Sequence, residues 1–275
     1  CTLTVAANTT VSASFVPDVT TNIALYAAVL PLSRSVEVGG TPATAFATIL
    51  NAGPGDASTC TIAPATGVPA SFAFQTTDPA TNALTGTANT PTNIPAGAGR
   101  SFVIAFTPNA AFAPTNVAFI FGCANANPAP SIAGVNTLVL SASTAPKPDI
   151  VALAASGDPG YVDIPGATGT GDFAVATVNL GAGAQITVSA DTGAANVPVM
   201  LTLCQTNPSS GACLATPTPN IVTTIAAEAT PTFGIFVAGQ GAAVPDLPAI
   251  NRVFVRFTDA GGALRGETSV AVRTQ

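Results

Sequence analysis

Histidine and tryptophan are absent from this chain, and charged residues are scarce. Of 275 residues only 7% are charged, against about 25% in an average soluble domain. The absence of histidine removes the usual general base of serine and cysteine hydrolases and a common zinc ligand. With so few charges, Thr, Ser and Asn must solvate most of the surface, and little charge repulsion keeps neighbouring copies apart.

The sign of the charge and the length of the apolar runs exclude further classes. The net charge is −6 and the pI about 4.2, whereas a nucleic-acid partner requires a basic face. No apolar run reaches the roughly 18 residues that span a bilayer. The positive mean hydropathy of +0.51 reflects many Ala and Val residues, as expected for buried strands. We therefore expect no nucleic-acid partner and no membrane span.

Glycine and proline, in contrast, are frequent. The 25 Gly and 24 Pro residues would interrupt long helices repeatedly, whereas strands joined by turns tolerate them. Short Val, Ile, Thr and Phe runs lie between clusters of turn residues, which is typical of all-β proteins. About seven such strands in each half predict two tandem immunoglobulin-like β-sandwiches with an N-terminal β-hairpin.

The two halves of the chain also resemble each other. The stretch 203–214, LCQTNPSSGACL, repeats the pattern of 73–84, AFQTTDPATNAL, and its two cysteines stand 130 positions after Phe74 and Ala83. Two positions that become cysteine together, on either side of a turn, predict a β-hairpin closed by a disulfide. Further matches join 23–25 to 151–153, 48–53 to 176–181 and 101–106 to 232–237. We interpret them as a duplication with seven strands in each copy.

This register predicts the domain organisation. Residues 1–16 would form a hairpin, either the tail of an upstream repeat or a connector between subunits. The first sandwich would occupy 17–143, with PDVTTN as its leading linker, and the second would occupy 149–275. The segment TAPKP at 144–148 would be a stiff linker, since it contains two prolines.

The first sixteen residues, CTLTVAANTTVSASFV, alternate in hydrophobicity on both sides of an Ala-Asn-Thr turn. The pattern resembles the last hairpin of bacterial extracellular repeat modules, which end in forms such as C-T-V-T-M-x-A-x-x-x-V-x-A-x-F. The resemblance implies a bacterial surface protein, although the rest of that module is missing. Because two strands alone are marginally stable, the hairpin should pack on another module or subunit. The candidate contact residues are Cys1, Leu3, Val5, Val11 and Phe15.

Residues 40–140 also resemble bacterial Ig-like modules related to the ASPM/SPD-2/hydin group. The matching positions are Asn51 and Gly53 of an Asn-x-Gly turn, then the segment from Pro95 to Pro108 with Phe102 and its alternating apolar neighbours. Members of that group are mostly accessory, adhesive or structural modules without catalytic residues. The resemblance therefore implies a sandwich with no enzymatic activity.

The five cysteines are interpreted mainly as structural. Cys204 and Cys213 flank eight residues and would clamp a hairpin, and Cys60 and Cys123 would join two strands of the first sandwich. Four cysteines paired in this way favour an oxidising compartment. Cys1 is left over, and a lipidated N-terminal cysteine is the alternative for it. Metal binding is the alternative for the others, but the chain has no C-x-x-C and no His.

Other chemistry has little support in the sequence. No G-x-S-x-G occurs, and the single lysine, Lys147, lies in a linker, so we expect no catalytic residues and no cofactor. Asp158, Asp163 and Asp172 lie in one Gly-rich region and could hold calcium, although a D-x-D-x-D run is lacking. Tyr161 is the candidate aromatic for glycan contact, with packing at a strand edge as the alternative.

The sequence thus predicts a non-enzymatic extracellular or cell-surface bacterial protein. Its role would be structural or adhesive, as a segment of a stalk, fibre or filament that self-associates through β-strand and apolar contacts. The alternative is a glycan- or protein-binding accessory module of a larger secreted enzyme. Self-association would separate the two, because the accessory module is expected to be monomeric.

Overall fold

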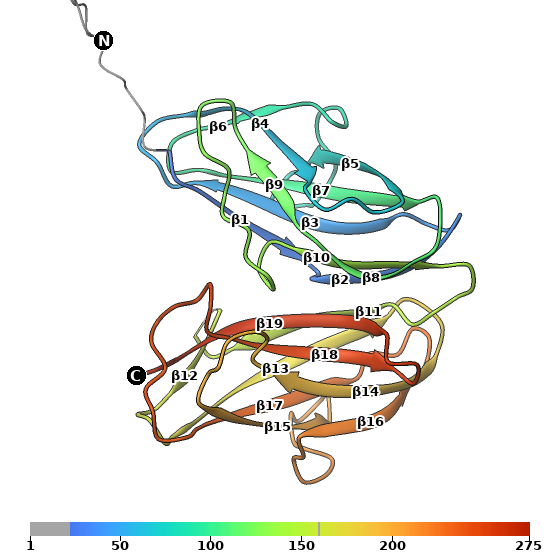
Figure 1. Ribbon diagram of the computed structural model, residues 1–275, viewed down its shortest axis with the longest axis vertical. Helices are drawn as coiled ribbons and strands as arrows, with labels where there is room; N and C mark the ends of the chain where they lie inside the picture. The colour runs from blue at the N-terminus through green and yellow to red at the C-terminus, as the bar shows by residue number, and fades with distance from the viewer. Residues whose placement is uncertain (1–22, 159) are drawn as a thin grey trace, which may run out of the picture.

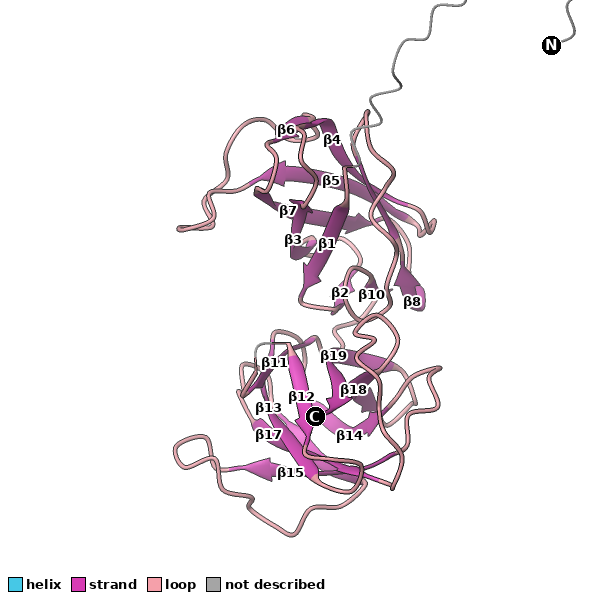
Figure 2. Cartoon of the chain, turned by 90° about the vertical axis from the view of Figure 1, so that its left-hand side faces the viewer, coloured by secondary structure: helices cyan, strands magenta, loops and turns pink. Residues whose placement is uncertain are grey.

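The computed structural model describes residues 23–158 and 160–275, and every regular element in these ranges is a β-strand. The predicted all-β fold is confirmed: the strands form two β-sandwiches that follow one another along the longest axis of the molecule (Figures 1 and 2). Among these residues, no helix is long and apolar enough to cross a membrane. The predicted N-terminal hairpin lies outside the described residues.

The first sandwich has one sheet with the strand order β1-β3-β7-β5, and a second side made of two groups, β2-β10-β8 and β6-β4-β9. Its strands are β1 (Leu25–Leu30), β2 (Ser33–Glu37), β3 (Ala43–Asn51), β4 (Ala57–Pro64), β5 (Ala70–Thr76), β6 (Thr92–Ile94), β7 (Gly99–Pro108), β8 (Phe112–Val117), β9 (Phe119–Gly122) and β10 (Leu138–Ser143).

The second sandwich packs the sheet β11-β13-β17-β15 against a five-stranded sheet with the order β12-β19-β18-β14-β16. Its strands are β11 (Ile150–Ser156), β12 (Tyr161–Ile164), β13 (Thr170–Asn179), β14 (Ala184–Asp191), β15 (Val199–Thr206), β16 (Asn220–Ile225), β17 (Thr232–Gly239), β18 (Arg252–Asp259) and β19 (Leu264–Thr274).

The two sandwiches share one strand order and differ at a single interruption. In the second, β18 pairs with both β19 and β14. In the first, the corresponding strand is divided at Ala118 into β8, which pairs with β10, and β9, which pairs with β4. The five-stranded sheet of the second sandwich therefore appears as two smaller groups in the first.

Each sandwich encloses its own core, because the strands alternate between buried and exposed side chains. In β3, for example, every second residue from Ala43 to Asn51 is buried and the residues between them are exposed. Phe102, Phe106 and Phe121 are the largest fully buried side chains of the first core, and Phe233 and Phe257 those of the second.

An asparagine turn recurs at one place in both sandwiches. Asn51 ends β3 and donates through Nδ2 to the carbonyl of Ile94 at 3.1 Å, while its Oδ1 accepts from the N–H of Gly53 at 3.0 Å. Asn179 ends β13 and makes the same pair of contacts, with Ile225 at 3.3 Å and Gly181 at 3.1 Å. The two turns therefore have equivalent hydrogen bonds, as their matching sequences predict.

Elsewhere the predicted register between the halves is wrong in detail. Leu25 pairs with Asn51 and Ile150 pairs with Asn179, so the first strands correspond three positions away from the predicted match of 23–25 with 151–153. The structure has ten strands in the first sandwich and nine in the second, whereas the register predicts seven in each. Strands β4, β6, β14 and β16 are missing from that register. Strand β4 shows little apolar alternation, whereas in β14 the buried Ile186 and Val188 alternate with polar residues, so this strand could have been predicted.

The match between the two hairpins is also off by one residue. Asp78 and Asn207 take the same place in their turns: each accepts, through a side-chain oxygen, the N–H groups of the second and third residues that follow. Cys204 therefore corresponds to Gln75, not to Phe74, and Cys213 corresponds to Leu84. The repeated Gln-Thr pair suggests an alignment that is wrong by one residue. The error matters because a one-residue slip moves side chains to the other face of a strand.

Candidate functional site at the junction of the sandwiches

The two sandwiches meet along β2 of the first and along β11 and β19 of the second (Figure 1). The side chains that cross this boundary are mostly polar, and many of them are buried. Ser33, Ser35, Asp149, Arg265 and Glu267 are all less than a tenth exposed. Buried polar groups are stable only when they are hydrogen-bonded, so the partners of these residues define the junction.

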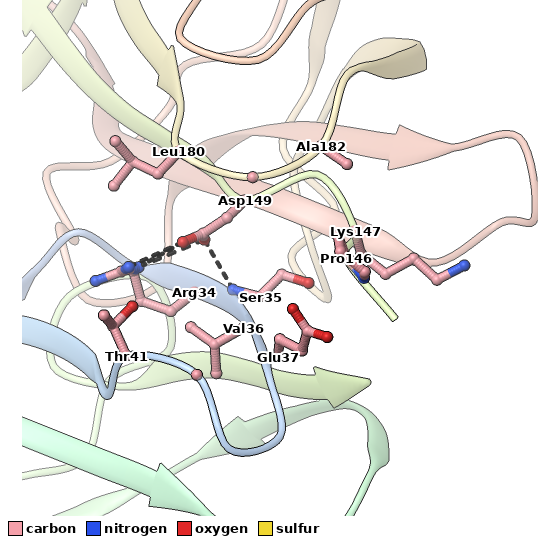
Figure 3. Close-up of a pocket in the computed structure, with 12 residues that line it drawn as sticks. Arg34, Ser35, Val36, Glu37, Thr41, Pro146, Lys147, Asp149, Leu180 and Ala182 are labelled. Atoms are coloured by element: carbon pink, nitrogen blue, oxygen red, sulfur yellow. Dashed lines mark hydrogen bonds and ion pairs between the residues drawn. The ribbon is translucent and has the colours of Figure 1, made fainter. Parts of the chain in front are cut away.

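Arg34 and Asp149 form the central ion pair of the junction (Figure 3). Arg34 donates to Asp149 Oδ2 from Nε at 3.0 Å and from Nη2 at 2.9 Å. The backbone N–H of Ser35 donates to the other oxygen of the carboxylate, Oδ1, at 2.8 Å. Both side chains are nearly excluded from solvent, at 10% and 5% exposure, so each charge depends on the other sandwich for its compensation.

Serine hydroxyls make a second set of contacts across the boundary. Arg265 donates from Nη1 to Ser35 Oγ at 2.9 Å, and Ser141 Oγ donates to the same oxygen at 2.9 Å. Ser33 Oγ accepts the backbone N–H of Glu267 at 2.7 Å. Because these serines lie on β2 and β10 and their partners on β19, the edge of the first sandwich is joined to a central part of the second.

The charged residues of β19 are themselves held within the second sandwich. Arg265 donates from Nε to Asp259 at 2.7 Å, and Glu267 pairs with Arg256. Burial raises the pKa of Glu267, and the attraction of Arg256 offsets only part of that effect. Burial also opposes ionisation of Asp259, but the hydrogen bonds from Arg265 and from backbone N–H groups outweigh it, so the pKa of this carboxyl is lowered.

A glycine loop of the first sandwich makes the closest approach. The carbonyl of Gly134 accepts a hydrogen bond from Ser269 Oγ at 2.6 Å. A Cβ added to Gly134 would lie 2.5 Å from Cε1 of Phe254 and 2.6 Å from Ser269 Oγ, and the φ angle is +75°, which disfavours other residues. This loop therefore fits against β18 and β19 only because residue 134 has no side chain.

The linker is fixed to the second sandwich as well. The N–H of Asp149 donates to Asn179 Oδ1 at 3.1 Å, and its carbonyl accepts the N–H of Leu180 at 2.8 Å. The carbonyl of Lys147 accepts the N–H of Ala182 at 3.0 Å. The asparagine turn thus holds the backbone of the residue whose carboxylate binds Arg34. Beside it lies an open polar pocket of about 380 Å³, whose lining includes Glu37 and Lys147 (Figure 3).

The structure brings the four predicted internal cysteines together in two disulfides. Cys60 on β4 is bonded to Cys123, next to β9, and Cys204 on β15 is bonded to Cys213. The first disulfide is buried in a sandwich core, and the second closes the loop that follows β15. The other predicted contact residues, Cys1, Leu3, Val5, Val11 and Phe15, lie outside the described part of the chain.

Two of the three acidic residues considered for calcium, Asp158 and Asp163, bind an arginine. Arg273 donates to Asp163 at 2.8 Å, to Asp158 at 2.9 Å and to Asp246 at 3.1 Å, while Asp172 is exposed on β13. Across residues 23–158 and 160–275, no group of three or more His, Cys, Asp or Glu side chains is arranged to hold a metal ion. The guanidinium of Arg273 thus compensates Asp158, Asp163 and, from a distant part of the chain, Asp246.

Sequence reasoning missed the junction itself. Arg34 and Asp149 are 115 positions apart, and no motif links them. One signal was available. In a chain with seven cations, four arginines lie in the last 24 residues, two of them on β18 and two on β19. Such concentration of a scarce residue indicates that these strands need positive charge for their own contacts.

Comparisons with known proteins give weak likenesses. No model of a protein family matches the chain, and no characterised protein matches its sequence. The ASPM/SPD-2/hydin resemblance therefore gains no support. Among solved structures, the secreted serine protease VesC of Vibrio cholerae is similar over 80% of this chain, at 11% identity and a TM-score of 0.26, and the chain spans 47% of that protein.

Two surface proteins show likenesses of the same strength. For the major pilin subunit BcpA of Bacillus cereus the identity is 10% and the TM-score 0.27, over 91% of this chain and 69% of the pilin. For the CupB6 tip adhesin of Pseudomonas aeruginosa they are 9% and 0.26, over 93% and 99%. At such values the likenesses assign the chain to no family.

Proposed function

We propose that this chain is a non-enzymatic structural or adhesive segment of a bacterial cell-surface or secreted protein. In this role the two sandwiches act as one stiff unit of a stalk, fibre or filament. The observation that carries the proposal is the buried polar junction, in which Arg34, Ser35 and Asp149 exchange charge-assisted hydrogen bonds across the boundary.

Relative motion is the default for two domains joined by a short linker. Here, bending would separate Arg34 from Asp149 and break the hydrogen bond from the N–H of Ser35, so the carboxylate would lose all its contacts with the first sandwich. The Gly134 contact opposes displacement on another part of the boundary. A segment that keeps its shape under load is what a stalk or fibre requires.

Two further observations support an extracellular role. Disulfides persist in oxidising compartments, and this chain has two of them, Cys60–Cys123 and Cys204–Cys213. The arginines near the junction are bound in ion pairs within or between the sandwiches. Charge in this molecule is thus used for internal contacts, as expected of a structural component.

The test is nitrogen-15 relaxation of the backbone amides in the whole chain. A stiff unit tumbles as one body, so amides of both sandwiches should fit one rotational diffusion tensor. In Asp149→Ala the two sandwiches should tumble more independently, with shorter correlation times. The matched control is Asp163→Ala, which removes an ion-paired carboxylate away from the junction and should leave the single tensor unchanged. Independent tumbling in the unmodified chain would sink the proposal.

One observation favours the alternative of a glycan- or protein-binding accessory module. The polar pocket at the junction is open and presents Glu37 and Lys147 beside the linker. Tyr161, the aromatic candidate for glycan contact, is already engaged, because the guanidinium of Arg273 lies 4.1 Å from the centre of its ring. A glycan array would separate the two functions: binding that is lost in Lys147→Ala would support the accessory module.

A further inference from the structure

The outer face of the sheet β1-β3-β7-β5 carries bulky apolar side chains where solvent is expected. Tyr26 is 57% exposed, Leu30 49%, Phe46 44% and Leu50 41%. They form two cross-strand pairs, Tyr26 with Leu50 and Leu30 with Phe46. Directly opposed side chains on one face are in contact range, so each pair is an apolar contact. The two pairs lie on one face of β1 and β3 with Ala28 and Thr48 between them, and we call these four large residues the patch.

The second sandwich shows that the fold does not need this bulk. Its strands β11 and β13 pair in the same way, and the counterpart of the Leu30–Phe46 pair is Ala155–Ala174. The sheet forms with two alanines at these positions, and the large residues of the first sandwich gain little from intramolecular burial. Exposed apolar patches of this kind mark interaction sites.

The rest of the face completes a self-complementary surface. On the β7 and β5 side it has an apolar hollow of about 270 Å³, lined by residues that include Ala73, Leu84, Val103 and Ala105. A two-fold axis through the middle of the sheet would place the patch of each copy over the hollow of the other. Such an arrangement is isologous, because the same surface serves on both copies.

Charge and area are compatible with a second copy. The outward positions of the four strands carry Ala, Val, Leu, Thr, Ser, Gln, Phe and Tyr, and no charged residue, so the net negative charge does not oppose pairing there. Four strands about 4.8 Å apart, six to ten residues long, give a flat area of about 510 Å². That is somewhat less than the roughly 600 Å² per partner at the lower limit of specific interfaces, so we expect the pairing to be reversible.

We infer that this face binds the same face of a second copy of the chain, so that two sheets pack against each other across a two-fold axis. Twisted sheets pack face to face with their strands roughly aligned, as they do inside each sandwich. The inference rests on the proposed structural role, since it names one contact by which units would assemble.

The experiment is sedimentation equilibrium on the full chain over a range of concentrations. We expect a monomer–dimer equilibrium whose dissociation constant rises at least tenfold in the double variant Leu30→Ala/Phe46→Ala. That variant copies the second sandwich and should keep the fold, which circular dichroism checks. Tyr26→Asp is the second variant, because it would bury a charge against the apolar hollow of the other copy in the dimer.

The matched control is Leu153→Ala, an equally exposed leucine on β11 of the other sandwich, which should leave the dissociation constant unchanged. Two outcomes would overturn the inference: a chain that stays monomeric at the highest soluble concentration, or a dimer unaffected by either variant. A dimer lost in Val222→Lys alone would also overturn it, because Val222 lies on the edge strand β16. Relaxation of the monomer tests the junction separately, so the two failures are distinguishable.

Discussion

Replacement of Asp149 by alanine tests the energetic weight of the junction. In the native chain this carboxylate is 5% exposed and accepts hydrogen bonds from Arg34 and from the N–H of Ser35. Removal of one partner of a buried ion pair typically costs 3–5 kcal/mol, because the other charge stays buried. Arg34 keeps one bond in the variant, from Nη1 to the carbonyl of Thr44 at 2.6 Å. We therefore expect a loss of about 3 kcal/mol in the free energy of unfolding.

A double-mutant cycle isolates the pair from its surroundings. In the chain that lacks both side chains, Arg34→Ala/Asp149→Ala, no charge is buried without a partner. The double variant should then be more stable than the sum of the two single losses predicts, by about 2 kcal/mol. Coupling of this size is usual for residues in one buried network.

The chain offers a convenient optical assay. It has no Trp and two Tyr residues, Tyr26 in the first sandwich and Tyr161 in the second. In Tyr26→Phe the tyrosine emission reports only the second sandwich, and in Tyr161→Phe only the first. Urea unfolding of these two reporters should give one coincident transition in the native background and two separate transitions in the Asp149→Ala background.

The reasoning would be refuted by either of two results. A loss below about 1 kcal/mol in Asp149→Ala would place the pair among exposed ion pairs, which contribute little. Separate transitions of the two reporters in the native background would mean that the junction does not couple the stability of the sandwiches, whatever its geometry.

Two further predictions concern the same boundary. Gly134→Ala should lower the free energy of unfolding in urea by about 2–4 kcal/mol, because it combines a left-handed φ with overpacking against Phe254. The control is Gly97→Ala, which has a similar φ of +69° and open space around it. An equal loss in both variants would contradict the role of packing against Phe254. Burial raises the pKa of Glu267 above its ordinary value of 4.5. The folded state therefore binds this proton more tightly than the unfolded state does. As a result, the free energy of unfolding should fall as the pH rises from 4.5 through the raised pKa. Unfolding measured across that range should lose this slope in Glu267→Gln, and an unchanged slope would assign it to other groups.

The fold could be predicted from sequence further than the site could. Alternating apolar residues and frequent turns are local signals, and they were sufficient for an all-β chain with two sandwiches. The repeated Asn-x-Gly turns even gave the correct equivalence of Asn51 and Asn179, since a buried asparagine that bonds at least four backbone groups tolerates few changes. Strand β4 was missed because its Ser, Thr and Ala residues show no clear apolar face, whereas β14, with Ile186 and Val188 at alternate positions, carried the signal and was overlooked.

The junction could not be predicted in this way, for a physical reason. Its contacts join residues from two separate hydrophobic cores, and their pairing depends on how one sandwich is oriented on the other. A serine such as Ser35 looks like a solvating residue of a low-charge surface until a partner buries it. The same ambiguity explains why Asp158 and Asp163 were considered for calcium. Carboxylates close together can bind a metal ion or an arginine, and only the structure shows that Arg273 lies between these two.

The junction is specific to this pair of sandwiches, and this limits how larger assemblies can form. The carbonyls of Ala24 and Asp149 accept equivalent hydrogen bonds, from the N–H of Ala52 and of Leu180 respectively, each after the shared asparagine. Ala24 therefore occupies in the first sandwich the place of Asp149 in the second, and it has no carboxylate. A unit placed before residue 23 could not be held by the same ion pair. Contacts of the first sandwich with a unit at that end must use other groups, and the uncharged outer face of β1-β3-β7-β5 is available because the hydrogen bonds between the two sandwiches involve β2 and the loop at Gly134.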